Sequence, residues 1–493
     1  MAGRRSVAAL MMVAMLAGCG GGDGGGGGGG GSTTTGGGST GGGTTTASSG
    51  CTLRARQDWV TAQMREWYLF PETLPANPNP AAYSTVSDYL DSLTATARAQ
   101  NKDRYFTYLT SIKDENAYYA SGSSAGFGWR LGLDSSGRLF VTEAFEGAPA
   151  LAAGIDRGAE ILAIGTSSGT LQTVSSLYNS GGSALSDALG PSTAGTSRTF
   201  QIRDASGTRT VAVSKTDFTL TPVSSRYGAQ IITDAGQRYG YVNLRTFIDT
   251  ADPALRAAFQ QFRTAGITNI IVDLRYNGGG LISIAELMSN LLGGNRQTSE
   301  VMAYTTFRSE KSAQNSTTFF NPQPQSVAPT RVAFIGAGGT ASASEYVINA
   351  FIPYLHANTA LIGSNTYGKP VGQIALDQAA CDDRLRVIAF ALQNAARQGA
   401  YYTGLAGTVE ASCRAADDIG YPMGDAREAS TRAALDFLQG KSCTRIGASA
   451  STASSGAGNE AQALSVRLPE SREALQPQPA RMSPAQREVP GLF

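Results

Sequence analysis

A serine and a lysine that lie 25 residues apart (369 − 344) are the side chains best suited to chemistry in this sequence. Ser344 follows a run of small residues at positions 340–343, at the start of an expected helix. Lys369 lies on a loop behind a short strand-like stretch. A serine hydroxyl becomes a nucleophile when a neighbouring base removes its proton. The pair therefore predicts acyl transfer, with Ser344 as nucleophile and Lys369 as base.

The spacing around Ser344 bears on two further possibilities, a capping serine and a histidine base. Ser344 could be a helix cap, but Ser342 and Glu345 already form the S-x-x-E pattern of a capping box. Histidine is the usual base, and the sequence has one, His356, twelve residues beyond Ser344 in the same expected helix. At 1.5 Å per residue that is about 18 Å, far beyond hydrogen-bond reach. A Ser-His-Asp triad within one chain is excluded if that helix is continuous.

Lysine is the remaining base, as in the serine–lysine variants of the triad. It can accept a proton only if burial lowers its pKa well below about 10.4. The flanking residues 367–371 carry no other charge, and Gln373 could orient the amine without adding one. A carboxylate at that position would instead favour the charged ammonium. The alternative is an ordinary exposed loop lysine.

Several other function classes find no support in the sequence. The glycine triplet at 278–280 is not part of a GxxxxGK[ST] or GxGxxG pattern, which argues against nucleotide binding. The formal charge of +1, without a basic stripe, argues against nucleic acid as a partner. One histidine and no CxxC pair leave no zinc-finger spacing. We expect no metal and no cofactor.

An α/β pattern from residue 218 onward must position the two candidate residues. The expected order is strand 239–244, helix 255–262, strand 270–274, helix 282–292, strand 331–335 and, after the Ser344 helix, strand 360–363. The loops at 277–280 and 338–344 both follow a strand and open a helix. In α/β sheets such loops, at the carboxyl ends of strands, are where ligands bind. Residues 51–120 predict packing helices.

Residues 121–217 predict a β domain. A strand-like run starts near Gly126-Phe127-Gly128, a short helix covers 147–153, and strands 200–202 and 210–213 form a closing hairpin. This order, with the segment GAPALAAGIDRGAEILAIG, resembles a PDZ domain, a module that adds a peptide C-terminus as an extra strand. The resemblance implies that Gly126, Phe127 and Gly128 bind the peptide carboxylate. Alternatively, the glycines only permit a tight strand entry.

The first 50 residues predict export and a tether. Two arginines precede a run of about ten apolar residues, the length of a signal-peptide core and too short to span a bilayer. The ending LAGC at 16–19 resembles a bacterial lipobox, which implies a signal peptide over 1–18 and lipidation of Cys19. An ordinary signal peptide with a chance cysteine is the alternative. Residues 19–50 predict a flexible tether, and residues 447–493 a disordered tail.

Four cysteines remain: Cys51, Cys381, Cys413 and Cys443. An even number in an exported chain suggests disulfides, and three pairings are open. We favour Cys381–Cys413, with Cys51–Cys443 closing the two ends of the ordered region. Four free, buried thiols are the alternative.

Three segments resemble the C-terminal processing (tail-specific) peptidases, serine enzymes with a serine–lysine dyad. That family's D-L-R-x-N-x-G-G pattern matches residues 273–280, S-A-S-A-S-E matches 340–345, and G-K-x-x-x-Q matches 368–373. The family's serine and lysine are also 25 residues apart. The resemblance covers about residues 55–440. It implies a multi-domain α/β fold, with a helical N-terminal cap (51–120), a PDZ-like β domain (121–217) and a ClpP/crotonase-like α/β catalytic core (218–446).

Carried over position by position, the resemblance implies that Ser344 is the nucleophile, Lys369 the general base and Gln373 its orienting partner. Backbone N–H groups near Gly279 and Gly280 would hold the oxyanion. Asp273 and Arg275 look structural, not catalytic. The chain departs from the family pattern at Thr340, which replaces a serine, at Gly278, where proline is common, and at Pro370, where glycine is usual. These departures leave substrate preference open.

The implied function is an endopeptidase that cleaves exported or unfolded proteins near their C-termini. The PDZ-like domain would capture apolar C-terminal tails, while a lipid anchor would hold the enzyme in the bacterial cell envelope. Gly20 is not the aspartate that retains lipoproteins in the inner membrane, so we expect the outer membrane, facing the periplasm. Two alternatives lack catalysis: a PDZ scaffold with an inactive enzyme domain, and a hydrophobic-ligand binder related to retinoid-carrying proteins. The oligomeric state is not predicted.

Overall fold

The computed structural model describes residues 50–181, 183–447, 465–466, 482–490 and 492–493. The predicted signal peptide, Cys19, the tether up to residue 49 and most of the predicted disordered tail lie outside this part of the chain. Within it, no helix has the length and apolar character needed to cross a membrane. The described residues also contain no group of three or more His, Cys, Asp or Glu side chains able to hold a metal ion.

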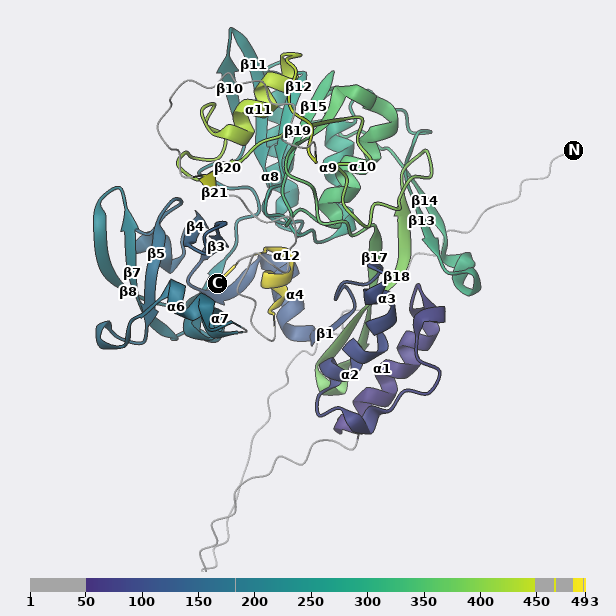
Figure 1. The fold of residues 1–493 in the computed structure, drawn as a ribbon. Helices are drawn as coiled ribbons and strands as arrows, with labels where there is room; N and C mark the ends of the chain where they lie inside the picture. The colour runs from purple at the N-terminus through teal and green to yellow at the C-terminus, as the bar shows by residue number, and fades with distance from the viewer. Residues whose placement is uncertain (1–49, 182, 448–464, 467–481, 491) are drawn as a thin grey trace, which may run out of the picture. The chain divides into compact units, whose positions relative to one another are not determined.

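A six-stranded sheet forms the predicted α/β core (Figure 1). In spatial order its strands are β10 (Gln230–Asp234), β11 (Gln237–Asn243), β12 (Asn269–Asp273), β15 (Arg331–Gly336), β16 (Thr359–Gly363) and β19 (Ala411–Arg414). The strands from β11 to β19 run parallel, and β10 is antiparallel to β11. The predicted α/β fold class is therefore confirmed, as are the four strands predicted in this region.

Helices cover both faces of this sheet, and the residues of β12 show why. Ile270 and Val272 belong to one apolar core, while Ile271 between them belongs to another. The helices packed against the sheet are α8 (Ala251–Thr264), α9 (Ile282–Leu292) and α10 (Ala343–Leu355) in the first core and α11 (Ala429–Leu438) in the second. Side chains alternate along a strand, so a sheet covered on both faces requires an uninterrupted apolar run.

A second, antiparallel sheet joins the N-terminal region to the core. Its strands are β1 (Tyr108–Ser111), β18 (Asp383–Gln393), β13 (Val301–Phe307) and β14 (Ser316–Phe319) in spatial order, with β17 (Val371–Gln378) also paired to β18. The N-terminal region contains α1 (Leu53–Trp67), α2 (Val86–Leu93), α3 (Ala95–Ala99) and α4 (Ile112–Ser121). Its helical character is confirmed, but β1 was not predicted, because four residues are too few for a periodic signal.

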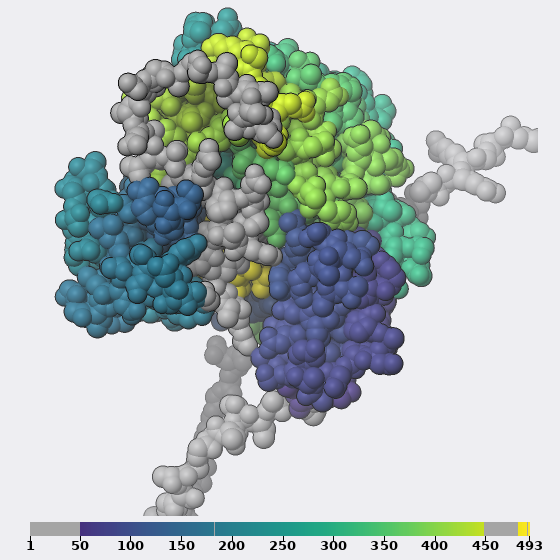
Figure 2. All heavy atoms as spheres, viewed as in Figure 1, coloured from purple at the N-terminus to yellow at the C-terminus, as the bar shows by residue number. Residues whose placement is uncertain are grey.

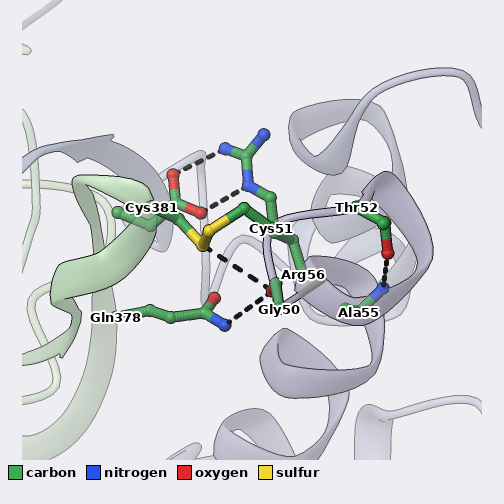
Figure 3. Close-up of a disulfide and its surroundings, with 8 residues drawn as sticks. Gly50, Cys51, Thr52, Ala55, Arg56, Gln378 and Cys381 are labelled. Atoms are coloured by element: carbon green, nitrogen blue, oxygen red, sulfur yellow. Dashed lines mark hydrogen bonds and ion pairs between the residues drawn. A yellow bond between two sulfur atoms is a disulfide. The ribbon is translucent and has the colours of Figure 1, made fainter. Parts of the chain in front are cut away.

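The four cysteines form two disulfides, but the predicted pairing is wrong. Cys51 pairs with Cys381 and Cys413 with Cys443. Figure 3 shows Cys51 just ahead of α1 and joined to Cys381, which lies between β17 and β18. Beside this disulfide, Arg56 of α1 donates two hydrogen bonds to the carboxylate of Asp383, the first residue of β18. The pairing depends on which distant segments meet, and sequence spacing does not reveal that.

Residues 123–219 form the predicted β domain. Its antiparallel sheet has the spatial order β3 (Trp129–Leu133), β4 (Leu139–Ala144), β5 (Glu160–Gly165), β7 (Ser197–Asp204) and β8 (Gly207–Ser214), with β6 (Gln172–Thr173) also beside β5. Short helices α5 (Pro149–Ala152), α6 (Val174–Asn179) and α7 (Ala184–Leu189) accompany the sheet, and β2 (Ser123–Gly126) pairs with β9 (Thr216–Thr219) in a separate two-stranded sheet. The predicted short helix and closing hairpin are confirmed. The boundary at residue 217 stays a prediction.

The last residues of the sequence are packed, contrary to the predicted disorder of the tail. They form α12 (Pro484–Glu488), capped by Ser483, and earlier in the tail β21 (Ser465–Val466) pairs with β20 (Asp417–Asp418). Val489 and Leu492 are buried in one apolar cluster and Phe493 in the core of the β domain. The composition of the whole tail predicted disorder, but the apolar residues Val489, Leu492 and Phe493 pack into the folded part of the chain.

A buried ion-pair network holds the loop after β12. Arg275 donates to Asp273 at 2.9 Å and, with two nitrogens, to Glu428 at 2.8 Å. Asp417 accepts from Arg275 at 3.1 Å and from Arg157 of the β domain at 2.9 Å. Burial by itself would raise the pKa of Glu428, but the charge and hydrogen bonds of Arg275 outweigh it and lower that pKa to about 2. These contacts agree with the structural role expected for Asp273 and Arg275.

Replacing Glu428 with Gln should reduce the free energy of unfolding by about 3 kcal/mol near pH 7, because the buried Arg275 guanidinium loses one of its charged partners. The folded-state pKa lies below the usual 4.5, so this stabilisation is complete above about pH 4.5 and disappears as the pH falls toward 2. Urea unfolding of wild type and variant at pH 7 and pH 3 measures the difference. Glu410→Gln, at a half-exposed position, is the control. If the difference in free energy of unfolding between wild type and Glu428→Gln is as large at pH 3 as at pH 7, the lowered pKa of Glu428 is contradicted.

Candidate active site

Ser344 lies in the first turn of α10, which follows the carboxyl end of β15. The side chain is fully buried, and its Oγ donates to the carbonyl oxygen of Asn277 at 3.0 Å. The N–H of Ala341 donates to the same carbonyl at 3.1 Å. His356 follows the far end of α10 and is exposed, so it takes no part in the site, as the sequence analysis expected. Two of the three motif segments therefore meet at Asn277.

Glu345 joins α10, which carries Ser344, to the loop of residues 366–369, which carries Lys369 and is called the lysine loop below. Its buried carboxylate accepts four hydrogen bonds, from Ser342 N–H at 3.0 Å, Thr366 O–H at 2.6 Å, Gly368 N–H at 2.7 Å and Lys369 N–H at 2.7 Å. The bond from Ser342 belongs to the predicted capping box; the other three hold the lysine loop. Burial raises the pKa of Glu345, and the four donors act against that rise. The sequence predicted only the capping role of Glu345.

Lys369 and Gln373 contact each other, as the spacing suggested. The side chain of Lys369 is buried, and its Nζ donates to Gln373 Oε1 at 3.0 Å. Gln373 Nε2 in turn donates to the carbonyl oxygen of Phe106 at 2.5 Å, which fixes the orientation of the amide. The Phe106 ring centre lies 5.3 Å from Nζ. The lysine amine therefore faces an uncharged oxygen and an aromatic ring.

Arg104 is a positioning residue that the sequence analysis did not identify. Its guanidinium donates to the carbonyl oxygens of Tyr367 at 2.5 Å, Gly368 at 2.9 Å and Tyr402 at 3.2 Å. It also lies 4.1 Å from the centre of the Tyr367 ring. Arg104 belongs to the N-terminal region, for which the sequence predicted only packing, and no local pattern links it to a loop more than 260 residues away.

The glycines after Asn277 permit a close approach between two loops. Gly279 has φ +123°, and a Cβ there would lie 2.8 Å from the Cβ of Ser342. A Cβ on Gly280 would lie 2.2 Å from the carbonyl oxygen of Phe247. The N–H of Gly279 donates to Asn277 Oδ1 at 2.9 Å. The oxyanion role of Gly279 and Gly280 stays a prediction.

A cavity of about 1010 Å³ reaches this site from the N-terminal region. Its lining includes Lys369, Phe106 and Gly278, together with residues 482–484 and 487–488 of the C-terminal segment. Yellow atoms of that segment are visible beside the purple N-terminal helices in Figure 2, in keeping with the cavity that both line. Ser344 does not line the cavity and is fully buried.

The predicted peptide-binding loop contacts the last residue of the sequence. The N–H groups of Gly128 and Trp129 donate to the backbone oxygen of Phe493 at 3.1 and 3.4 Å. Gly126 lies against the same backbone, since a Cβ there would come within 3.0 Å of the carbonyl carbon of Phe493. Phe127 is buried in the same apolar core as the Phe493 side chain.

Two segments of the chain match family models. Residues 238–400 match peptidase family S41, and residues 55–108 match the peptidase S41 N-terminal domain. The first match spans β11 to β18 and so includes Ser344, Lys369 and Gln373.

Named relatives agree with these matches. The chain is 27% identical over 333 residues to carboxyl-terminal-processing peptidase 3, chloroplastic, of Arabidopsis thaliana, which covers 64% of this chain and 56% of that protein. It is 28% identical over 178 residues to the chloroplastic C-terminal processing peptidase of Tetradesmus obliquus, covering 35% of this chain and 36% of that protein. The chain thus spans about half the length of the first relative and about a third of the second.

A solved structure shares the fold. A protein assigned to the S41 proteases from Bacteroides fragilis superposes with a TM-score of 0.59 at 23% identity, covering 78% of this chain and 97% of that one. At this identity the likeness shows the fold alone. The two family models, the relatives and the motif segments agree: this chain is similar to peptidase family S41 over residues 238–400 and to the S41 N-terminal domain over residues 55–108.

Proposed function

We propose that this chain is a serine endopeptidase that uses Ser344 as nucleophile and Lys369 as general base. One observation carries the proposal. The carboxylate next to Ser344, that of Glu345, accepts the N–H groups of Gly368 and Lys369. The two candidate residues, 25 apart in sequence, therefore belong to one hydrogen-bonded loop system. The match of residues 238–400 to peptidase family S41 supports the same assignment.

The proposed reaction needs no group beyond these side chains and water. The neutral Lys369 amine takes the proton of the Ser344 hydroxyl while that oxygen attacks the substrate carbonyl carbon. The tetrahedral intermediate collapses, the peptide C–N bond breaks, and the leaving amine takes the proton back from Lys369. Water then attacks the acyl-enzyme, again with Lys369 as base, and releases the second fragment. Gln373 orients the amine through Oε1 without adding charge.

We assign the substrates by the β domain. It resembles a PDZ domain in strand order, and β3 lies at an edge of its sheet next to the loop of residues 126–128. A strand at the edge of a sheet can bind an extended peptide through main-chain hydrogen bonds. We therefore propose exported or unfolded proteins with apolar C-termini as substrates, cleaved near those ends.

Ser344→Ala and Lys369→Ala should each reduce cleavage of an unfolded protein with an apolar C-terminal tail by at least about a thousandfold, because each removes a group that acts in the chemical step. Initial rates of fragment formation measure the loss. Ser309→Ala and Lys311→Ala, in a turn before β14, are matched controls that should keep full activity. Cleavage retained by either site variant would overturn the dyad. An inactive wild type would favour the scaffold alternative.

Gln373→Glu should move the pH of half-maximal activity upward by about one unit, because a carboxylate beside an ammonium stabilises its charged form. The pH dependence of kcat/KM between pH 6 and 10 measures the shift. Gln378→Glu, at the other end of β17, adds the same charge away from Lys369 and is the matched control. If both variants keep the wild-type profile, Lys369 is not the base.

We propose that the protein is lipid-anchored in the bacterial cell envelope, at the outer membrane facing the periplasm. The support is the LAGC ending at residues 16–19. Cys19→Ala should abolish incorporation of labelled palmitate and release the protein from the membrane fraction. Ser32→Ala, in the glycine-rich stretch that follows, should change neither property. Labelling that survives in Cys19→Ala would refute the anchor.

A further inference from the structure

The edge of the β domain that could take a peptide is occupied by residues 492 and 493 of the same chain. Phe493 N–H donates to the carbonyl oxygen of Trp129 at 3.1 Å, and Gly128 N–H donates to Phe493 at 3.1 Å. Leu492 pairs antiparallel with Arg130 of β3. Since β3 is an edge strand, these residues extend the sheet by a short added strand.

The side chains of this added strand fill apolar sites. Phe493 is 4% exposed and belongs to the core that contains Phe127 and Trp129. Leu492 is 2% exposed and packs in the cluster that contains Phe145. The site therefore fits an extended peptide in which an aliphatic residue is followed by an aromatic one.

The residues just before this strand reach the candidate active site. The carbonyl oxygen of Glu488 accepts a hydrogen bond from Gly278 N–H at 2.8 Å. A Cβ on Gly339, in the turn before Ser344, would lie 3.4 Å from the Pro490 side chain. Gly278 directly precedes the glycines predicted to hold the oxyanion. A backbone carbonyl of the segment thus accepts a hydrogen bond from the loop that we predict to hold the oxyanion.

Side-chain contacts also hold the segment in place. Glu488 accepts from the hydroxyl of Tyr119 at 3.2 Å, and the Arg487 guanidinium lies 3.8 Å from the centre of the Tyr108 ring. The donor at Gly278 exists because this position is not proline, which has no N–H. Residues 487–490 and 492–493 therefore make specific contacts that extend from the loop of residues 277–280 to the edge of the β domain.

We infer that residues 482–493 are a built-in ligand of this chain. This segment occupies the peptide site at β3 and covers the loop of residues 277–280 until a substrate displaces it. The occupancy stands on the contacts above, whereas the blocking effect rests on the proposed function. A ligand tethered to its own site has an effective concentration on the order of millimolar. Even modest affinity of the segment for the edge of β3 then keeps the peptide site occupied.

The first experiment measures occupancy without any cleavage. A fluorescent peptide with the sequence of residues 482–493 is titrated against full-length Ser344→Ala protein and against the same protein carrying Phe493→Asp. We expect at least tenfold tighter binding to the second, because its own end no longer competes. Ser344→Ala with Phe319→Asp, a matched change at a half-exposed position, should bind like the first protein. Equal affinity in all three proteins, or no binding by any, would overturn the inference.

A second variant provides the same test in case Phe493→Asp does not fold. Leu492→Asp should give the same gain in affinity, and thermal melts should show that both variants keep a cooperative transition. A gain seen with neither variant, although both are folded, would also overturn occupancy by the chain's own end.

The second experiment tests blocking in the protein that retains Ser344. Phe493→Asp should raise kcat/KM for an unfolded protein at least tenfold, mainly through a lower KM, and added peptide 482–493 should inhibit this variant competitively. Unchanged kcat/KM in an active enzyme would refute blocking. If wild type and variant both fail to cleave any protein, the proposed function fails, while the peptide titration still decides whether the segment occupies the groove.

Discussion

The buried carboxylate of Glu345 is the contact on which the candidate site depends. A carboxylate removed from water is strongly destabilising unless hydrogen bonds replace its hydration. Here four donors do so, and three of them come from residues 366–369. The need to satisfy one buried group therefore holds the lysine loop against the first turn of α10. Glu345 therefore both caps its own helix and holds a loop that is distant in sequence.

The loop on the other side of Ser344 is held by charge. Arg275 is shared among Asp273, Asp417 and Glu428, and Arg157 of the β domain reaches the same Asp417. Breaking one contact in such a network leaves a buried charge unpaired, so the arrangement resists gradual deformation. The carbonyl of Asn277, at the end of this loop, consequently meets Ser344 in a defined position.

The contacts of residues 492 and 493 with β3 illustrate recognition at a sheet edge. Recognition at a sheet edge uses main-chain groups, which every peptide carries, and apolar pockets, which read only one or two side chains. Residues 492 and 493 satisfy both requirements at β3, through main-chain hydrogen bonds and two buried apolar side chains.

Much of the fold follows from local sequence. The apolar runs of β11, β12 and β15, the glycine turns and the S-x-x-E cap depend on neighbouring residues, so the sequence by itself determined the α/β core and the positions of Ser344 and Lys369 within it. The pairing of Cys51 with Cys381, the strand β1, the grip of Arg104 on the lysine loop and the packing of residues 482–493 were decided only in the tertiary structure. Each depends on segments that are distant in sequence, which meet because burial and hydrogen bonding favour the contact, and no spacing along the chain encodes that meeting.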